Sequence, residues 1–125
     1  MKIAFDLDGT LWSYQTTFAR MHYLFMVSAH KVGILTEHFD KQQEDLLLLS
    51  KRGFAPFDFY ICKTERNQLE GEDDASWKLR MMAQYNIDLL FDDCDNENDH
   101  AYQEMMDSGR VISIKPRLPL KKHFK

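Results

Sequence analysis

Four aspartates stand directly after two apolar segments of the chain. Asp6 and Asp8 follow the first segment, Ile-Ala-Phe, and Asp92 and Asp93 follow a later one, Ile-Asp-Leu-Leu-Phe. If both segments are parallel strands, their carboxyl ends meet at the edge of the sheet where ligands of such folds bind. Four carboxylates so close together repel one another unless a cation neutralises them. Because hard oxygen ligands suit Mg²⁺, these residues predict a magnesium site.

The same residues are of the types that phosphoryl transfer requires. With Mg²⁺ held by Asp6 and Asp93, a free oxygen of Asp6 can attack phosphorus and form an aspartyl-phosphate. Asp8 projects from the same side of an extended segment and can serve as general acid and base. Thr36 offers a hydroxyl and Lys78 a positive charge to the phosphate oxygens, and backbone N–H groups after the first strand complete the cradle. We therefore expect a Mg²⁺-dependent phosphomonoester hydrolase.

Short apolar segments alternate with longer amphipathic ones, and together they must position these residues. Apolar runs predict strands, and apolar residues at helical spacing predict helices. The expected strands are 2–5, 31–35, 57–62, 87–91 and 111–114; the expected helices are 14–29, 40–52, one capped by Ser76, and 96–108, with an acidic loop over 65–74. This alternation indicates an α/β fold: a three-layer, Rossmann-like parallel sheet of about five strands with helices on both faces.

The composition is that of one small globular domain. The chain has 125 residues, 44% hydrophobic and 29% charged, which allows one core and leaves too little for a second full domain. No apolar run approaches the roughly 20 residues that span a bilayer, and the first acid comes too early for a signal peptide. Two cysteines exclude a disulfide-rich secreted scaffold. We therefore expect a cytoplasmic protein without a membrane partner.

Charge separates the expected catalytic core, residues 1–115, from a basic tail, residues 116–125. The formal net charge is −4, yet residues 110–125 hold six basic side chains and no acid. The preceding residues hold 10 basic and 20 acidic side chains, a balance of −10, which argues against broad nucleic-acid binding. The tail could still contact a phosphate-bearing partner, although a solvated terminus accounts for its lysines as well.

The segment Phe5-Asp6-Leu7-Asp8-Gly9-Thr10-Leu11 resembles the first motif of the haloacid dehalogenase-like phosphohydrolases, Asp-x-Asp-Gly-Thr. Thr36 is similar to the second-motif Ser/Thr, Lys78 to the third-motif lysine, and Asp92-Asp93-Cys94-Asp95-Asn96-Glu97 to the acidic fourth motif. The four motifs occur in the family's order and cover nearly the whole chain. The resemblance implies Asp6 as nucleophile and Asp8 as acid/base; Leu7, Thr10, Thr36 and Lys78 as phosphate-binding residues; and Asp6, Asp8, Asp92 and Asp93 as Mg²⁺ ligands.

Asp-Leu-Asp-x-Thr-Leu-Trp, which ends at Trp12, is similar to the magnesium-dependent phosphatase-1 group. That group is a capless branch described as acting on protein phosphotyrosine and sugar phosphates. The sequence departs from it at Gly9, where the group has a bulkier residue, and in the additional residue of Ser76-Trp77-Lys78. Neither 12–31 nor 62–76 is long enough for a separate cap domain. We therefore expect an open site and a phosphorylated substrate, either a small molecule or a macromolecule.

Several assignments have alternatives. Lys63, at the end of the third expected strand, competes with Lys78, and Thr36 could instead cap a helix before Glu37. Asp92 and Asp93 could form a simple turn, and the sequence does not decide which of them is the main metal ligand. Alternative functions are a nucleotidase or nucleic-acid-end 3′-phosphatase of the same superfamily, or a non-catalytic phosphate-binding or regulatory module. The presence of an acid/base aspartate favours the hydrolase, because a module that only binds has no chemical use for it.

Overall fold

The computed structural model describes residues 1–93 and 102–114 as strands that alternate with helices. The elements in chain order are β1 (Lys2–Phe5), the wide turn η1 (Leu7–Leu11), α1 (Gln15–Val27), β2 (Lys31–Phe39), α2 (Gln42–Lys51), β3 (Phe59–Lys63), α3 (Asp74–Gln84), β4 (Leu89–Asp92), α4 (Gln103–Asp107) and β5 (Val111–Ser113).

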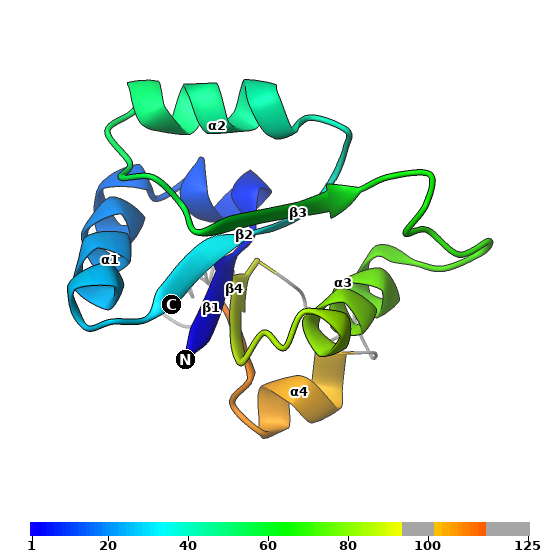
Figure 1. The fold of residues 1–125 in the computed structure, drawn as a ribbon. Helices are drawn as coiled ribbons and strands as arrows, with labels where there is room; N and C mark the ends of the chain where they lie inside the picture. Colours follow the sequence, from blue (N-terminus) through cyan, green and yellow to red (C-terminus); the bar gives the residue numbers. More distant parts are fainter. Residues whose placement is uncertain (94–101, 115–125) are drawn as a thin grey trace, which may run out of the picture.

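The five strands form one parallel sheet in the order β3-β2-β1-β4-β5 (Figure 1). The chain lays β2 and β3 on one side of β1 and then returns to the other side for β4 and β5. The strand order therefore reverses between β1 and β4, the kind of position at which parallel sheets bind ligands. This topology confirms the predicted α/β fold class and a single domain.

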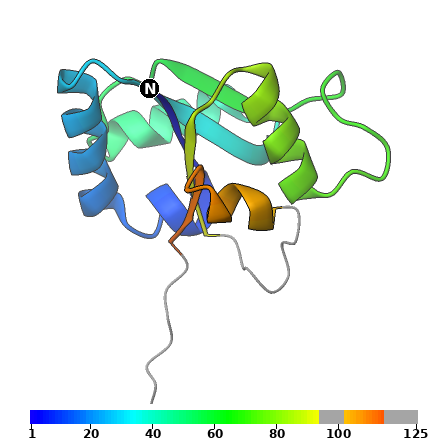
Figure 2. The same cartoon turned by 90° about the horizontal axis from the view of Figure 1, so that it is seen from below.

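Helices cover both faces of the sheet, as predicted for a three-layer fold. Helices α1 and α2 pack on one face, where Phe5, Phe18 and Leu49 belong to one buried cluster. Helices α3 and α4 pack on the other face, against a cluster that includes Ala4 and Met81. Figure 2 shows α1 and α3 on opposite sides of the strands. Because neighbouring residues of β1 point to opposite faces, this one strand contributes to both cores.

The element boundaries differ from the predicted ones at two places that matter for the site. Strand β2 runs to Phe39, beyond the predicted end at Leu35. Helix α3 is capped by Asp73, whose carboxylate accepts a hydrogen bond from the Ser76 amide at 2.7 Å; the prediction that Ser76 is the cap was wrong. An aspartate at this position accepts a hydrogen bond from an otherwise unpaired N–H group of the first turn, and its negative charge interacts favourably with the positive amino end of the helix.

Some predictions lie outside the described residues: the first part of the expected helix 96–108, positions 94–97 of the fourth motif, and the tail 116–125. The boundary between core and tail at residue 115 therefore stays a prediction. Among the described residues, no helix has both the length and the apolar character that crossing a membrane requires.

Candidate active site at the carboxyl edge of the sheet

Three aspartates meet where the strand order reverses. Asp6 directly follows β1, Asp92 is the last residue of β4, and Asp93 comes next. The strands are held in register by pairing, and the Asp6 amide donates a hydrogen bond to the Phe91 carbonyl at 3.0 Å. One carboxylate oxygen from each aspartate lies within 4.8 Å of the others, so the three can hold a metal ion. This convergence was predicted from the position of each residue after a strand.

Lys78 brings a positive charge to this group from α3. Its ammonium nitrogen lies 3.1 Å from Asp6 Oδ1, 3.0 Å from Asp92 Oδ2 and 2.9 Å from Glu37 Oε2. Lys78 is only 4% exposed, and Asp6 and Asp92 are equally buried. The predicted rival, Lys63, instead pairs with Asp74 and lies over the Trp77 ring. The structure therefore places Lys78, and not Lys63, at the nucleophile predicted from sequence.

The site holds more negative than positive charge. With every group ionised, the four carboxylates and one ammonium would carry a net charge of −3, and a divalent cation would bring this to −1. Burial raises the pKa of Asp6 well above its ordinary value, and the carboxylates of Asp92 and Glu37 add to this effect, while Lys78 opposes it. Burial and Asp92 likewise raise the pKa of Asp93. Two carboxyl groups with raised pKa values beside each other indicate a site suited to an additional cation.

Asp92 differs from its neighbours because its carboxylate accepts hydrogen bonds from two donors. Burial opposes its ionisation, but Lys78 and the other hydrogen-bond partners outweigh this and lower the pKa of the Asp92 carboxyl. Its Oδ2 accepts hydrogen bonds from Lys78 and from the Tyr102 hydroxyl, each at 3.0 Å. Asp93 is the more exposed of the two. The contacts of Asp92 and the greater exposure of Asp93 favour Asp93 as the carboxylate that faces an incoming ion, with Asp92 assisting.

A bulge in β2 delivers two further side chains to the site. Thr36 pairs with Cys62, but the next registered pair joins Phe39 to Lys63, so the two intervening residues of β2 have no partner in β3. Those residues are Glu37, which reaches Lys78, and His38, which reaches Asp8. Bulges often redirect side chains next to active sites. Because the bulge breaks the alternation of strand residues, the sequence pattern did not reveal either contact.

Thr36 itself lies inside β2 and is fully buried. Its hydroxyl oxygen accepts a hydrogen bond from the His38 amide at 3.2 Å. The alternative interpretation of Thr36 as a helix cap is wrong, because the next helix begins only at Gln42. Its predicted role in phosphate binding stays a prediction.

Asp8 ends a chain of polar contacts that runs into the protein. Its Oδ2 lies 2.8 Å from His38 Nε2, and His38 Nδ1 lies 2.8 Å from Asp45 Oδ2. Asp45 also accepts a hydrogen bond from the Tyr60 hydroxyl. Burial opposes protonation of His38, but the hydrogen bonds to Asp45 and Asp8 outweigh it and raise the pKa of the imidazole. The carboxylate of Asp8 is engaged by this chain and is not one of the three that converge, so its role as a metal ligand stays a prediction.

The first turn after β1 holds the remaining predicted residues. Leu7 and Thr10 are both fully buried, and the Thr10 hydroxyl has no hydrogen-bond partner among the residues that the structure describes. Gly9 has a φ of +74°, and a Cβ atom there would lie 2.0 Å from Asp93 Oδ2. Glycine at this position therefore allows the turn and Asp93 to occupy adjacent space.

Five residues that contact the site were not predicted to do so from sequence: Glu37, His38, Asp45, Tyr60 and Tyr102. For Asp45 a signal was available, because it lies four residues before Leu49 and shares the buried face of α2. An acid at a core-facing helical position needs a partner, and that partner is His38 with Tyr60. Tyr102 follows the segment 94–101, and its contact with Asp92 depends on tertiary packing.

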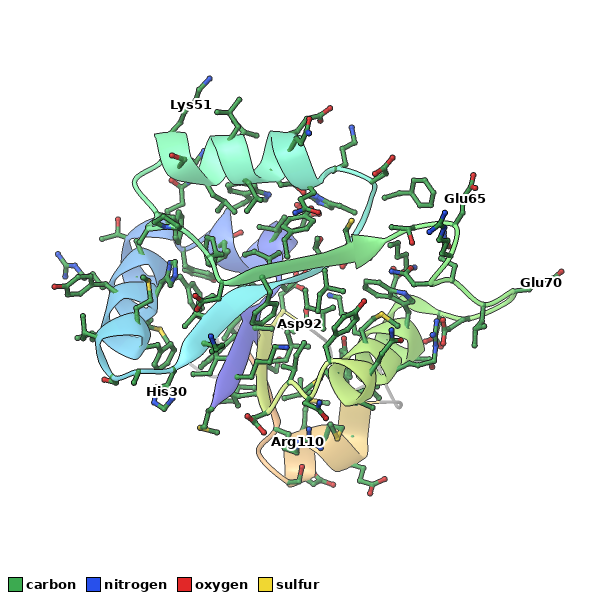
Figure 3. The ribbon with its side chains drawn as sticks, viewed as in Figure 1. His30, Lys51, Glu65, Glu70, Asp92 and Arg110 are labelled. Atoms are coloured by element: carbon green, nitrogen blue, oxygen red, sulfur yellow. The ribbon has the colours of Figure 1, made fainter. Side chains whose placement is uncertain are left out.

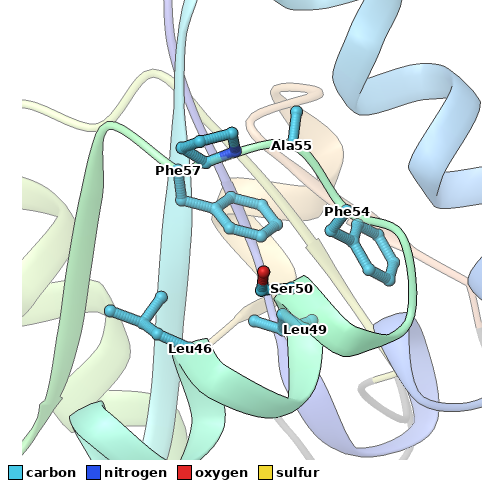
Figure 4. A pocket seen from close by; sticks show the side chains of 7 residues that line it. Leu46, Leu49, Ser50, Phe54, Ala55 and Phe57 are labelled. Carbon is cyan, nitrogen blue, oxygen red and sulfur yellow. The ribbon is translucent and has the colours of Figure 1, made fainter.

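A separate hollow of about 240 Å³ lies between α2 and the segment before β3 (Figure 4). Its lining is apolar apart from one hydroxyl, and it comprises Leu46, Leu49, Ser50, Phe54, Ala55, Pro56 and Phe57. This segment leads into the amino end of β3, whereas the aspartates lie at carboxyl ends. Asp92, the last residue of β4, is buried and is labelled in Figure 3. The hollow therefore has neither the position nor the residues for the predicted chemistry.

Comparisons of the chain with protein-family models, with curated proteins and with solved structures find no match.

Replacing Asp93 by Asn should weaken Mg²⁺ binding by on the order of tenfold or more, since even outer partners of metal ligands contribute 10- to 100-fold. Isothermal titration calorimetry measures this directly. Because the pKa values of Asp6 and Asp93 are raised, protons must leave these carboxyls when the ion binds, so affinity should increase with pH above the ordinary carboxyl range. Asp88→Asn is the matched control, because Asp88 binds the Lys2 amide at the opposite end of β4. Equal affinity in both variants would contradict the assignment.

Gly9→Ala should reduce Mg²⁺ affinity in the same assay, because the new methyl group would displace the Asp93 carboxylate. The control is Gly71→Ala: Gly71 also has a φ of +74°, but a Cβ atom added there would have no other atom within 4 Å. Both variants should lose about 1 kcal/mol of stability in urea unfolding, because alanine is strained at positive φ. Only Gly9→Ala should lose the metal. Unchanged Mg²⁺ affinity in Gly9→Ala would show that metal binding does not require the Asp93 carboxylate to lie in the space beside Gly9.

Proposed function

We propose that this protein is a metal-dependent phosphomonoester hydrolase of the haloacid dehalogenase-like kind that works through an aspartyl-phosphate on Asp6. One observation carries the proposal: at the reversal point of the strand order, the buried Asp6 carboxylate contacts the Lys78 ammonium and has an oxygen within 4.8 Å of an oxygen of Asp92 and of Asp93. The all-parallel sheet and the order of the motifs support the family assignment. The divalent ion proposed for the three aspartates is Mg²⁺, because all the donors are hard oxygen atoms.

In the proposed reaction, Asp6 attacks the phosphorus atom of a phosphate monoester. A bond forms between the Asp6 oxygen and phosphorus, and the bond to the leaving oxygen breaks. Asp8 gives its proton to that leaving oxygen. Water then attacks the phosphorus, Asp8 takes the water proton, and phosphate leaves with Asp6 restored as a carboxylate.

Lys78 has two functions in this scheme. Its hydrogen bond to Asp6 Oδ1 fixes the orientation of the nucleophile, and its charge stabilises negative oxygens nearby. Burial of the ammonium strengthens both effects, because little water screens it. Asp6 and Asp92 raise the pKa of Lys78 well above its ordinary value despite its burial, so it stays charged at neutral pH. The metal ion, when bound, would neutralise charge on the phosphoryl oxygens.

The proposed substrate is reached at an open edge of the sheet. The two positions at which a cap could be inserted contain only α1 and the loop before α3, and neither forms a second domain. Asp8 has a side chain that is 58% exposed, so a leaving group can approach it from solvent. This arrangement suits phosphate on a small molecule or on a macromolecule, and it supports placement in the capless branch.

Asp6→Asn and Asp8→Asn should separate the nucleophile from the acid/base. Asp6→Asn removes the attacking oxygen, so turnover of nitrophenyl phosphate should vanish. Asp8→Asn keeps the nucleophile and loses the group that activates water, so a burst of nitrophenol should precede slow turnover. Mass spectrometry of the quenched Asp8→Asn protein should show phosphate on the peptide that contains Asp6.

Asp58→Asn, a change at the amino end of β3, serves as the control and should retain wild-type turnover. Wild-type activity of the Asp6→Asn protein, or phosphate on another residue, would overturn the covalent mechanism. Full activity in excess chelator would overturn the metal requirement. Phosphate binding without turnover across nucleotides, sugar phosphates and phosphopeptides would identify a binding module instead.

A further inference from the structure

The chain Asp8–His38–Asp45–Tyr60 joins an exposed acid to a buried polar cluster. Both contacts of the His38 ring are 2.8 Å long, one to Asp8 Oδ2 and one to Asp45 Oδ2. Tyr60 donates its hydroxyl hydrogen to the same Asp45 oxygen. Because a carboxylate only accepts, Nδ1 of His38 carries the hydrogen toward Asp45, and Nε2 is left facing Asp8.

Three elements supply the three residues behind Asp8. His38 comes from the bulge of β2, Asp45 from the first turn of α2, and Tyr60 from β3. The side chain of Asp45 is 7% exposed and that of His38 is 23% exposed. An imidazole ring that is hydrogen-bonded at both nitrogens, one of them to a buried carboxylate, has little freedom to rotate. The same arrangement, a carboxylate behind a histidine, orients histidines in many active sites.

The contact with Asp8 is not needed to satisfy the buried cluster. Asp45 has its two donors without Asp8, whereas Asp8 is exposed and could be solvated by water. An exposed ion pair by itself adds little stability. The contact therefore matters more for Asp8 than for the cluster, because it holds an exposed carboxyl group in one orientation.

We propose that His38, held by Asp45 and Tyr60, is a positioning residue that fixes the carboxyl group of Asp8 for proton transfer. His38 occupies Oδ2 of Asp8, so Oδ1 is the oxygen that faces the leaving group and later the attacking water. This inference rests on the proposed function, since it assigns a role to the acid/base of the same site. The side chain of His38 contacts Asp8 and Asp45, and neither of these is one of the three aspartates that converge.

Leaving-group chemistry gives a test that a merely structural role would not pass. An alkyl phosphate has a poor leaving group that needs a proton, whereas nitrophenolate leaves without one. If His38 acts by orienting Asp8, its loss should slow the first step with alkyl phosphates far more than the first step with nitrophenyl phosphate. The second step, which uses Asp8 with either ester, should slow to the same extent for both. A general loss of folding or of metal binding would affect both esters to the same extent.

The experiment compares His38→Asn with His30→Asn. Asparagine at 38 keeps a donor near Asp45 but cannot reach Asp8, and His30 lies at the start of β2, against the N-terminal amine. We expect His38→Asn to lower the single-turnover rate of Asp6 phosphorylation by an alkyl phosphate by about 10- to 100-fold, with a much smaller loss in the rate of the nitrophenol burst. His30→Asn should match wild type. In the Asp8→Asn background, the change at His38 should cause no further loss of the nitrophenol burst.

Equal losses in the first-step rate for the two esters, or an undiminished loss in the Asp8→Asn background, would overturn the inference. A phosphoryl group found on Asp6 in the same experiment would leave the proposed function standing. Absence of turnover in the wild type would overturn both. If His38→Asn does not fold by circular dichroism, Tyr60→Phe replaces it. This variant removes one hydrogen-bond donor to Asp45. It should also slow the first step with alkyl phosphates more than with nitrophenyl phosphate, but by a smaller factor than His38→Asn. Equal losses on the two esters in Tyr60→Phe would also overturn the inference.

Discussion

The buried ammonium group of Lys78 lies among carboxylates from three neighbouring strands: Asp6 after β1, Glu37 in β2 and Asp92 in β4. Like charges at the ends of adjacent parallel strands would otherwise repel one another in a poorly solvated place. Loss of the ammonium would leave these charges buried without a partner, at a cost of about 3–5 kcal/mol. The contact also joins α3 to the edge of the sheet where the strand order reverses. The geometry of the nucleophile and of the metal ligands therefore depends on it.

The bulge in β2 determines which other side chains take part. A regular strand would place successive residues on opposite faces, but the two unpaired residues send Glu37 to Lys78 and His38 to Asp8. One backbone irregularity thus supports both parts of the site, the charged group around the nucleophile and the orientation of the acid/base. Glycine at position 9 plays a similar part on the neighbouring turn, since it leaves space for Asp93.

The fold class, the strands and the convergence of Asp6, Asp92 and Asp93 could be predicted from sequence because they depend on local patterns. Apolar runs mark the strands, and acids directly after parallel strands must meet at one edge. The residue type of Lys78 suggested a charge for phosphate oxygens, but its contact with Asp6 spans 72 residues and could not be read from local patterns. The contacts of Glu37, His38 and Tyr60 were not predicted, because a bulge arises only when two strands pair and cannot be read from one segment alone. The cap of α3 was misassigned to Ser76 because its backbone amide, and not its hydroxyl, makes the capping bond to Asp73.

Phosphorylation of Asp6 beside a bound cation can be observed directly in a crystal structure of the protein grown with Mg²⁺ and beryllofluoride, which mimics a phosphoryl group on a carboxylate. We predict beryllofluoride on an oxygen of Asp6 and Mg²⁺ ligated by oxygens of Asp6, Asp92 and Asp93 at about 2.0–2.1 Å. Lys78 should keep its contact with Asp6, and Asp8 should face the fluoride group. An adduct on another carboxylate, or a cation bound away from the three aspartates, would contradict this description of the site.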